Sequence, residues 1–224
     1  MKVVISLGGS LIIPDKIDVI YLRKFSKFIK HFVKKNNQVV IVCGGGKTAR
    51  KYIKDVKKSK YDFESLVGIE STKLNSALVA SYFNSFSLVP NSLEEVKKNL
   101  VKNKVVCVGA LGFQPEMTSD GDAAQIVDYL KADFFINMTN VRGLYDKDPK
   151  KYKNAKFISM ISFKDFFKTV KKLKYTPGQH FVLDQYAANL VCKKRIKTII
   201  LNSNLKNLNA CLKGKPFVGT VIND

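Results

Sequence analysis

Short apolar segments rich in β-branched residues alternate along this chain with longer segments whose apolar residues recur at helical spacing. The first kind is typical of buried strands, and the second is typical of helices packed on a sheet. Because parallel strands need long crossover connections, this alternation predicts the α/β class, as a three-layer α/β/α sandwich with a mainly parallel central sheet. We expect strands at residues 2–7, 38–43, 104–108, 134–137 and 197–202, and helices at 21–34, 49–56, 71–83, 93–99, 122–131, 162–173 and 183–194.

Glycine-rich or polar turns follow four of the expected strands. Residues 8–9, 44–46 and 109–112 close the first three strands with glycine, and the polar residues 139–140 follow the fourth. In open parallel sheets, ligands bind beyond the carboxyl ends of the strands. Glycine turns that lead into helices present backbone N–H groups to anions. The sequence therefore predicts that the first two loops form one site for a string of phosphates.

The stretch CGGGKTAR, residues 43–50, looks at first like the end of a Walker A loop. That motif needs a glycine five residues before Gly46, and this position is Ile41, inside an expected strand, so the motif is excluded. What remains is a glycine turn before a helix, with Lys47 and Arg50 one helical turn apart. This favours a phosphate site of another kind. A tight turn without a ligand stays open, since glycine also serves wherever φ is positive.

Two later loops carry hydroxyl and carboxylate groups. In GFQPEMTSDGDAA, residues 112–124, the side chains of Thr118, Ser119 and Asp120 lead into a helix. They could cradle a phosphate or a sugar there, or only cap the helix. The second loop, TNVRGLYDKDPKKY at residues 139–152, places aromatic and acidic residues after a buried strand, a composition that suits a nucleotide.

The net charge of +21 is carried almost wholly by lysine, because only four of the 39 basic residues are arginines. Such a charge could serve a polyanionic partner, but readers of nucleic acid favour clustered arginine, and these lysines are spread through every segment. We therefore expect a lysine-rich surface or steering of small anions, and no nucleic-acid partner. Two histidines leave no His-based zinc triad and no Ser-His-Asp arrangement.

No apolar run approaches the roughly 18 residues that a membrane-spanning helix needs, and no repeat or linker divides the chain. The four cysteines lie far apart without a C-x-x-C pair, which is typical of buried, reduced thiols. We expect a single domain over residues 1–224, located in the cytoplasm, with no signal segment and no membrane contact.

Six segments, taken together and in order, resemble the motifs of the amino acid kinase family, and within it those of the archaeal uridylate (UMP) kinases. The resemblance runs through essentially the whole chain. It implies an acceptor-binding lobe at about residues 1–135 and an ATP-binding lobe at about 136–224. It also implies transfer of the γ-phosphoryl group of ATP to UMP, giving UDP and ADP in pyrimidine nucleotide (CTP) biosynthesis, with Mg²⁺. The segments are SLGGSLIIPD from residue 6, VCGGGKTARKYI at 42–53, VGIESTKLNSAL at 67–78, GFQPEMTSD at 112–120, KADFFINMTNVRGLYDKDPK at 131–150 and LDQYAANLVCKKRIKTIIL at 183–201.

The resemblance also implies roles for individual residues. Phosphoryl transfer needs positioning and charge neutralisation more than covalent help, so glycine loops, a few charged side chains and Mg²⁺ suffice. The expected catalytic residues are Lys47, Arg50 and Asp120, and no metal ligands are assigned. ATP would contact Ser6, Leu7, Gly8, Gly9, Ser10, Gly45, Arg50, Thr139, Asn140, Tyr145 and Asp148. UMP would contact Gly44, Ser65, Phe113, Gln114, Pro115, Glu116, Met117, Thr118 and Ser119.

Three residues depart from the usual pattern of the family. Ser6 stands where many members have a lysine, Ser65 where an aspartate binds the ribose of the acceptor, and Arg142 where NVDG has its aspartate. Lys47, Arg50 or Arg142 could restore the lost positive charge. Two alternatives stay open: another small-molecule kinase of this family, or a catalytically weak nucleotide-binding sensor of the same fold. Relatives are commonly hexamers, so we expect a homo-oligomer.

Overall fold

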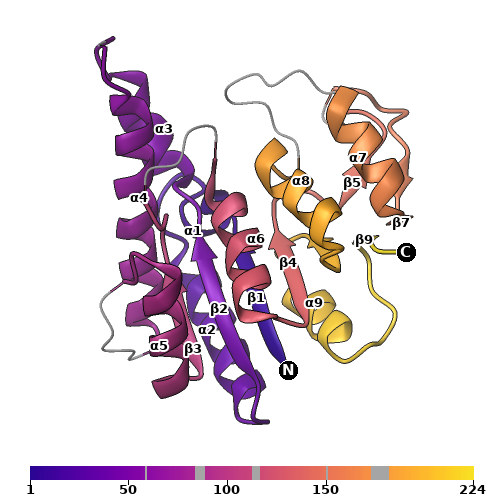
Figure 1. The fold of residues 1–224 in the computed structure, drawn as a ribbon, viewed down its shortest axis with the longest axis horizontal. Helices are drawn as coiled ribbons and strands as arrows, with labels where there is room; N and C mark the ends of the chain where they lie inside the picture. Colours follow the sequence, from indigo (N-terminus) through magenta and orange to yellow (C-terminus); the bar gives the residue numbers. More distant parts are fainter. Residues whose placement is uncertain (59, 84–88, 113–116, 150, 173–181) are drawn as a thin grey trace.

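The computed structural model describes residues 1–58, 60–83, 89–112, 117–149, 151–172 and 182–224. Within these ranges a seven-stranded sheet has the order β3-β2-β1-β4-β8-β9-β7, and a two-stranded sheet pairs β5 with β6 (Figure 1). The strands are β1 (Lys2–Leu7), β2 (Gln38–Cys43), β3 (Val105–Val108), β4 (Phe134–Met138), β5 (Leu144–Tyr145), β6 (Phe157–Ile158), β7 (Met160–Ile161), β8 (Thr198–Leu201) and β9 (Thr220–Ile222).

Strand β1 lies inside the parallel part of the sheet. It pairs in parallel with β2 on one side and β4 on the other. The next pairs outward, β2 with β3 and β4 with β8, are also parallel, whereas β9 runs antiparallel to β8. All five expected strands are present, with ends that differ by a residue or so. The strands β5, β6, β7 and β9 were not predicted, since two or three residues are too few to show a periodic pattern.

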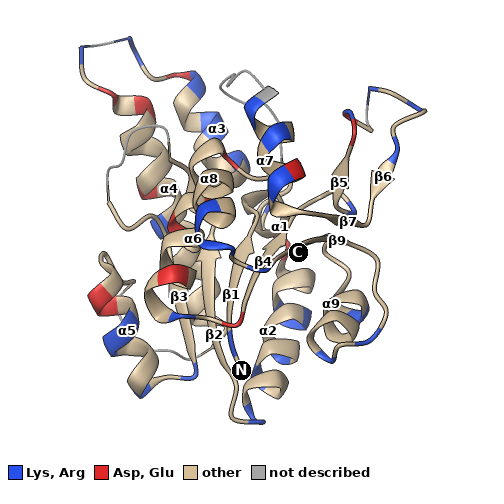
Figure 2. Ribbon diagram, turned by 45° about the vertical axis from the view of Figure 1, so that its right-hand side comes forward, with Lys and Arg blue, Asp and Glu red and all other residues tan. Residues whose placement is uncertain are grey.

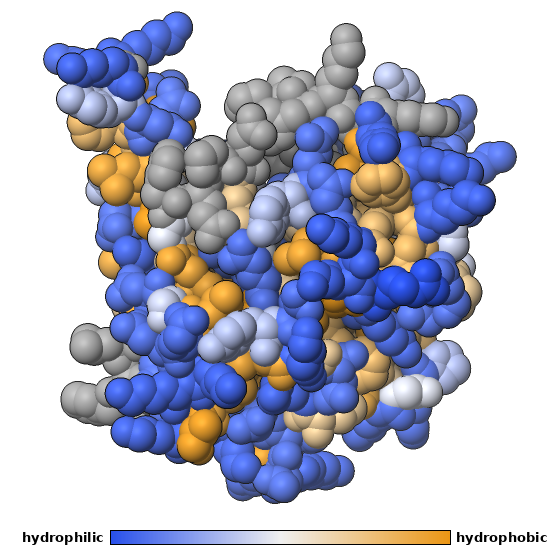
Figure 3. All heavy atoms as spheres, in the orientation of Figure 1, coloured by the Kyte–Doolittle hydropathy of each residue, from blue (hydrophilic) through white to orange (hydrophobic). Residues whose placement is uncertain are grey.

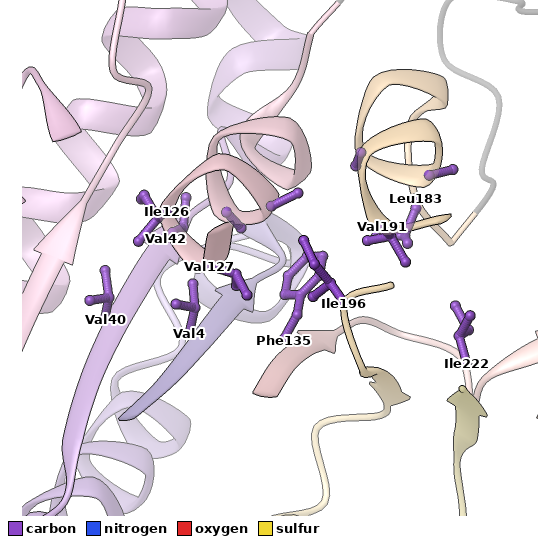
Figure 4. Packing of buried hydrophobic residues seen from close by; sticks show 14 of the residues in the cluster. Val4, Val40, Val42, Ile126, Val127, Phe135, Leu183, Val191, Ile196 and Ile222 are labelled. Carbon is purple, nitrogen blue, oxygen red and sulfur yellow. The ribbon is translucent and has the colours of Figure 1, made fainter. Parts of the chain in front are cut away.

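Helices cover both faces of the large sheet (Figure 1). One apolar core lies between the sheet and α1, α2, α9 and the end of α4. A second core lies between the other face and α5, α6, α7 and α8. Figure 4 shows part of this second core, where Val4, Val42 and Phe135 of the sheet lie near Ile126 and Val127 of α6. The predicted three-layer architecture is confirmed. The helices are α1 (Gly9–Ile12), α2 (Val19–Val33), α3 (Gly46–Lys54), α4 (Phe63–Ser81), α5 (Leu93–Lys102), α6 (Ser119–Leu130), α7 (Phe163–Lys172), α8 (Gln185–Lys194) and α9 (Leu205–Leu212).

The alternation of side chains along β1 decides which core each residue reaches. Val3, Ile5 and Leu7 belong to the core with α2, and Val4 belongs to the core with α6. Because side chains two residues apart on a strand share a face, Ser6 follows Val4 on the α6 side. The polar residue near the carboxyl end of β1 therefore faces the start of α6.

Helix α4 is longer than the helix expected at residues 71–83. It begins at Phe63, after Asp62, whose side chain accepts a hydrogen bond from the N–H of Ser65 at 2.9 Å. Several residues that α4 buries are polar, so apolar periodicity understates its length. Helix α9 was not expected, although Asn204 caps it by accepting hydrogen bonds from Lys206 and Asn207.

The lysine and arginine residues that the structure describes are spread over the surface and do not gather in one patch (Figure 2). Figure 2 shows basic residues on helices and loops throughout the molecule, including α2, α3 and α7. In the view of Figure 3, hydrophilic residues cover most of the visible face and smaller hydrophobic areas lie between them. Among the residues described here, no helix combines the length and the apolar character needed to cross a membrane.

Candidate active site

The glycine loops after β1 and β2 touch each other. A Cβ atom added to Gly9 would lie 2.1 Å from the nitrogen of Gly46, and one added to Gly46 would lie 2.4 Å from the carbonyl oxygen of Gly9. The φ angle of Gly46 is +62°, a value that residues with side chains seldom adopt. Glycine is thus needed at both positions for steric reasons. The two loops expected to form one site are brought together.

Backbone hydrogen bonds hold these loops to the strand ends beside them. The N–H of Gly44 donates to the carbonyl of Leu7 at 3.1 Å, and the N–H of Gly8 donates to the carbonyl of Met138 at 3.0 Å. Helix α1 follows directly and contains Gly9 and Ser10. The carboxyl ends of β1, β2 and β4 therefore form one continuous rim.

Asp120 lies under this rim at the start of α6. Its Oδ1 accepts a hydrogen bond from Ser6 Oγ at 2.6 Å, and Asn137 of β4 also bonds its carboxylate. Burial raises the pKa of Asp120 to about 7, the charge of Asp184 adds to the rise, and the bonds from Ser6 and Asn137 oppose it. Thr118, whose side chain accepts from the N–H of Asp120, is the residue that caps α6. The cap of α6 is thus Thr118, and the carboxylate of Asp120 is bonded to Ser6 of β1 instead.

Asp184 joins the start of α6 to the start of α8. Its Oδ2 accepts from the hydroxyl of Thr118 at 2.6 Å and from the N–H of Gly121 at 3.1 Å. Its Oδ1 accepts from the N–H of Ala187 at 2.6 Å, which caps α8. Sequence analysis did not select Asp184, although an aspartate three residues before an apolar helical segment is an N-cap signal.

Asp122 is a second acidic residue of α6 with a raised pKa. Its Oδ1 accepts from the N–H of Leu111 at 3.1 Å and so ties the loop after β3 to α6. Burial raises the pKa of Asp122 to about 7, against the lowering effect of this hydrogen bond. The site therefore combines the glycine loops at the strand ends with two carboxyl groups beneath them, those of Asp120 and Asp122, whose pKa values are raised to about 7.

The candidate cations differ in their surroundings. Lys47, at the start of α3, forms an ion pair with Asp15 of the segment after α1. Arg50 and Arg142 are exposed, and neither side chain forms a hydrogen bond or ion pair with another residue of the described part of the chain. No described cation forms an ion pair with Asp120. The candidate cations thus lie at the surface of the site, where Lys47 is paired with Asp15.

The expected UMP residues are placed only in part. The Oγ of Ser119 lies 3.5 Å from the position of a Cβ added to Gly44, so these two residues are brought together. Met117 packs against Gly121. Ser65 instead turns its hydroxyl to Asp62 Oδ2, at 2.5 Å. The residues Phe113, Gln114, Pro115 and Glu116 lie outside the described residues.

The expected ATP residues beyond the glycine loops lie after β4. Thr139 is fixed by its N–H, which donates to the carbonyl of Leu201 at 2.9 Å, and Asn140 is exposed. Tyr145 lies on β5 with its ring edge-on to that of Phe157, at 5.5 Å between centroids. The carbonyl of Asp148 accepts hydrogen bonds in the turn that follows. The roles of Tyr145 and Asp148 in binding ATP stay a prediction.

Comparison with known proteins decides the family. A model of the amino acid kinase family matches residues 1–202. The chain belongs to the amino acid kinase family. Two curated relatives of this chain are named uridylate kinase. The one from Archaeoglobus fulgidus is 36% identical over 99% of this chain and 100% of its own. The one from Methanococcus aeolicus is 31% identical over the full length of both chains.

Solved structures agree with the family. The crystal structure of uridylate kinase from Archaeoglobus fulgidus matches this chain with a TM-score of 0.85. The match covers 99% of this chain and 100% of the Archaeoglobus chain. The crystal structure of UMP kinase from Ureaplasma parvum has a TM-score of 0.77 at 23% identity, covering 100% of this chain and 99% of its own. At that identity the second likeness bears on the fold alone. The resemblance and the fold class expected from the sequence are confirmed.

Proposed function

We propose that this member of the amino acid kinase family is a uridylate kinase, which transfers the γ-phosphoryl group of ATP to UMP and yields ADP and UDP. The curated relatives of similar length, named uridylate kinase, support this assignment. The observation that carries it is the joined pair of glycine loops with Ser119 beside Gly44, over the carboxylate of Asp120. Two anionic substrates can meet at such a rim, where backbone N–H groups approach both.

The two lobes would divide the substrates between them. UMP would bind at residues of the first lobe, about 1–135, from Gly44 to the loop that ends at Ser119. ATP would lie over residues 6–10 and Gly45, with its base and ribose toward the turns after β4 in the second lobe. Lys47 and Arg50, at the start of α3, would neutralise charge that develops on the transferring phosphoryl group.

The carboxylates of the site fit Mg²⁺ that binds as a complex with ATP. Among the residues that the structure describes, no group of three His, Cys, Asp or Glu side chains could hold a metal alone. Mg²⁺ in kinases is usually bound by one or two carboxylates together with substrate phosphates and water. Asp120 is the carboxylate that the chain offers under the rim and would help to hold Mg²⁺, which would supply positive charge to neutralise the phosphates there.

An acceptor panel tests the proposal. ADP release is measured with ATP and Mg²⁺ against UMP, CMP, AMP, acetylglutamate and isopentenyl phosphate. Turnover that is selective for UMP supports it, and selective turnover of another acceptor replaces it with a different kinase of the family. Tight ATP binding with no turnover on any acceptor would point to the sensor, which the neutral Ser6 at a usual lysine position favours.

We further propose a cytoplasmic homo-oligomer, with a hexamer as the expected form, acting in pyrimidine nucleotide synthesis. Apolar side chains at the start of α2 support a contact between copies, since Ile17, Val19 and Ile20 are exposed. Sedimentation analysis gives the mass in solution, and a monomer at micromolar concentration would exclude the hexamer.

A further inference from the structure

Helix α4 buries a row of polar side chains where it passes the loops after β2 and β3. These residues are at most 7% exposed, although they lie in the middle of a 19-residue helix. Polar groups are normally kept out of such places unless they make hydrogen bonds. The row consists of Ser71, Thr72, Asn75 and Ser76.

Asn75 bonds the glycine loop after β2. Its Nδ2 donates to the carbonyl oxygen of Gly44 at 2.7 Å and to that of Gly45 at 3.1 Å. Its Oδ1 has no partner within the described part of the protein, and the side chain is 1% exposed. A buried oxygen without a partner costs free energy, so the amide is retained here for its two donors.

The hold on these carbonyls sets the direction of the next two N–H groups. In a trans peptide the C=O and the following N–H point in opposite directions. With the carbonyl of Gly44 turned toward Asn75, the N–H of Gly45 turns away from α4. The carbonyl of Gly45 is shared between Asn75 and the N–H of Ala49, the latter at 3.2 Å. Asn75 and the first turn of α3 therefore together direct the N–H of Gly46. Neither N–H donates to a backbone carbonyl of the described residues. Both therefore remain as donors for an anion at the start of α3.

Thr72 makes the equivalent contact to the next loop. Its Oγ1 accepts from the N–H of Ala110 at 2.7 Å and donates to the carbonyl of Ile69 at 2.7 Å. Thr72 and Asn75 are three residues apart and so share one face of α4. One helix thereby fixes the loops after both β2 and β3.

We propose that Asn75 is a positioning residue of the phosphoryl-transfer site, which aims the N–H groups of Gly45 and Gly46 at the phosphates of ATP. This inference rests on the proposed nucleotide site. Asn75 does not reach the substrate itself. It acts by engaging the carbonyl oxygens of Gly44 and Gly45 in hydrogen bonds, so that they do not turn toward the phosphates, which they would repel.

The test replaces Asn75 by leucine, which has similar size and no donor. Without the two hydrogen bonds the loop can turn a carbonyl toward the phosphates, so the affinity for Mg·ATP, measured by calorimetry without any acceptor, falls at least about tenfold. The KM for ATP rises by a similar factor. Ser76→Ala is the matched control. It removes a side-chain oxygen that is 0% exposed and has no partner among the described residues, from the next residue of α4, and should leave ATP affinity unchanged.

A second variant covers the case in which Asn75→Leu fails to fold. In Asn75→Asp, only the protonated carboxyl can donate to a carbonyl of the loop. Its activity relative to the parent protein should therefore rise as the pH is lowered, which a general loss of packing would not produce. The inference is overturned if Asn75→Leu folds and binds ATP with parental affinity. It is also overturned if the ratio of Asn75→Asp activity to parental activity does not change with pH. Because ATP affinity needs no acceptor, a parent that binds ATP but ignores UMP would sink the proposed function alone.

Discussion

Ser6 Oγ donates a hydrogen bond to Asp120 Oδ1 across 2.6 Å and so joins the end of β1 to the start of α6. In the register of the sheet, Ser6 lies beside Asn137, which bonds the same carboxylate. Two neutral side chains thus flank an acid at the place where many family members have a lysine. Under the proposed function, the cations that phosphoryl transfer requires would then come from Mg²⁺ and from the surface, where Lys47, Arg50 and Arg142 lie.

Removal of the Ser6 hydroxyl should shift the pH dependence of catalysis. The hydrogen bond from Ser6 lowers the pKa of Asp120, so Ser6→Ala should raise that pKa further and move the acidic limb of kcat/KM to higher pH. A shift of roughly one to two units is expected for one hydrogen bond to a charged group. Ser26→Ala, which removes a buried serine hydroxyl from α2, serves as the control. An acidic limb that coincides with that of the parent would contradict the role given to this contact.

The raised pKa of Asp120 predicts that stability falls as the pH rises. Since the folded state binds its proton more tightly than the unfolded chain, this residue contributes stability that is present below pH 3.8 and is lost as the pH rises to about 7. In metal-free buffer, Asp120→Asn should raise the free energy of unfolding at pH 8 by about 1 kcal/mol or more. Urea unfolding across this pH range measures it.

Asp128, on the same helix, serves as a control, because its substitution should change the free energy of unfolding in the opposite direction. The hydrogen bond from Lys131 lowers the pKa of Asp128, so its contribution is present above pH 3.8 and is lost in acid. Asp128→Asn should therefore lower stability slightly at neutral pH, by less than about 1 kcal/mol. If both substitutions changed stability in the same direction at pH 8, the electrostatic explanation would be wrong.

Much of the fold could be predicted because its signals are local. Strand β2 is a continuous apolar run after Gln38, and the apolar run of β1 is interrupted only at Ser6. The turn at residues 44–46 marks the carboxyl end of β2, so strand ends and glycine loops could be located from the sequence. The contact between Gly9 and Gly46 follows from the pairing of β1 with β2, which places the two turns side by side.

The contacts beneath the loops could not be predicted in this way. Asn75 lies 30 residues after Gly45, and Asp184 lies 63 residues after Gly121, so no spacing in the sequence joins them. Asn75 also lies inside a helix whose buried side is partly polar, where apolar periodicity gives no signal. Such residues become visible only when the backbone hydrogen bonds of a loop are followed to their partners.

Lys47 should be more important for turnover than its neighbours on α3. Its ion pair with Asp15 holds the ammonium near the glycine loops, and ATP would compete for it. Lys47→Met should lower kcat/KM about tenfold to a hundredfold, the effect of losing one charge-assisted contact. Lys51→Met, an exposed lysine one turn further along, should have little effect. Asp15→Asn should leave turnover intact and lower the KM for ATP. Equal losses in the two lysine variants would show that only general charge matters.

Arg142 is the cation gained where the family has an aspartate, and it is exposed in the turn after β4 that leads to Tyr145. With Ser6 neutral, Arg142 is expected to approach the β- or γ-phosphate of ATP, so Arg142→Ala should raise the KM for ATP and lower kcat, together about tenfold or more. Arg142→Lys should recover part of this loss because it keeps the charge without the planar fork. Arg23→Ala, which removes an exposed arginine of α2, is the control for net charge. Steady-state kinetics at low and high salt measure all three, and parental constants in Arg142→Ala would remove this residue from the site.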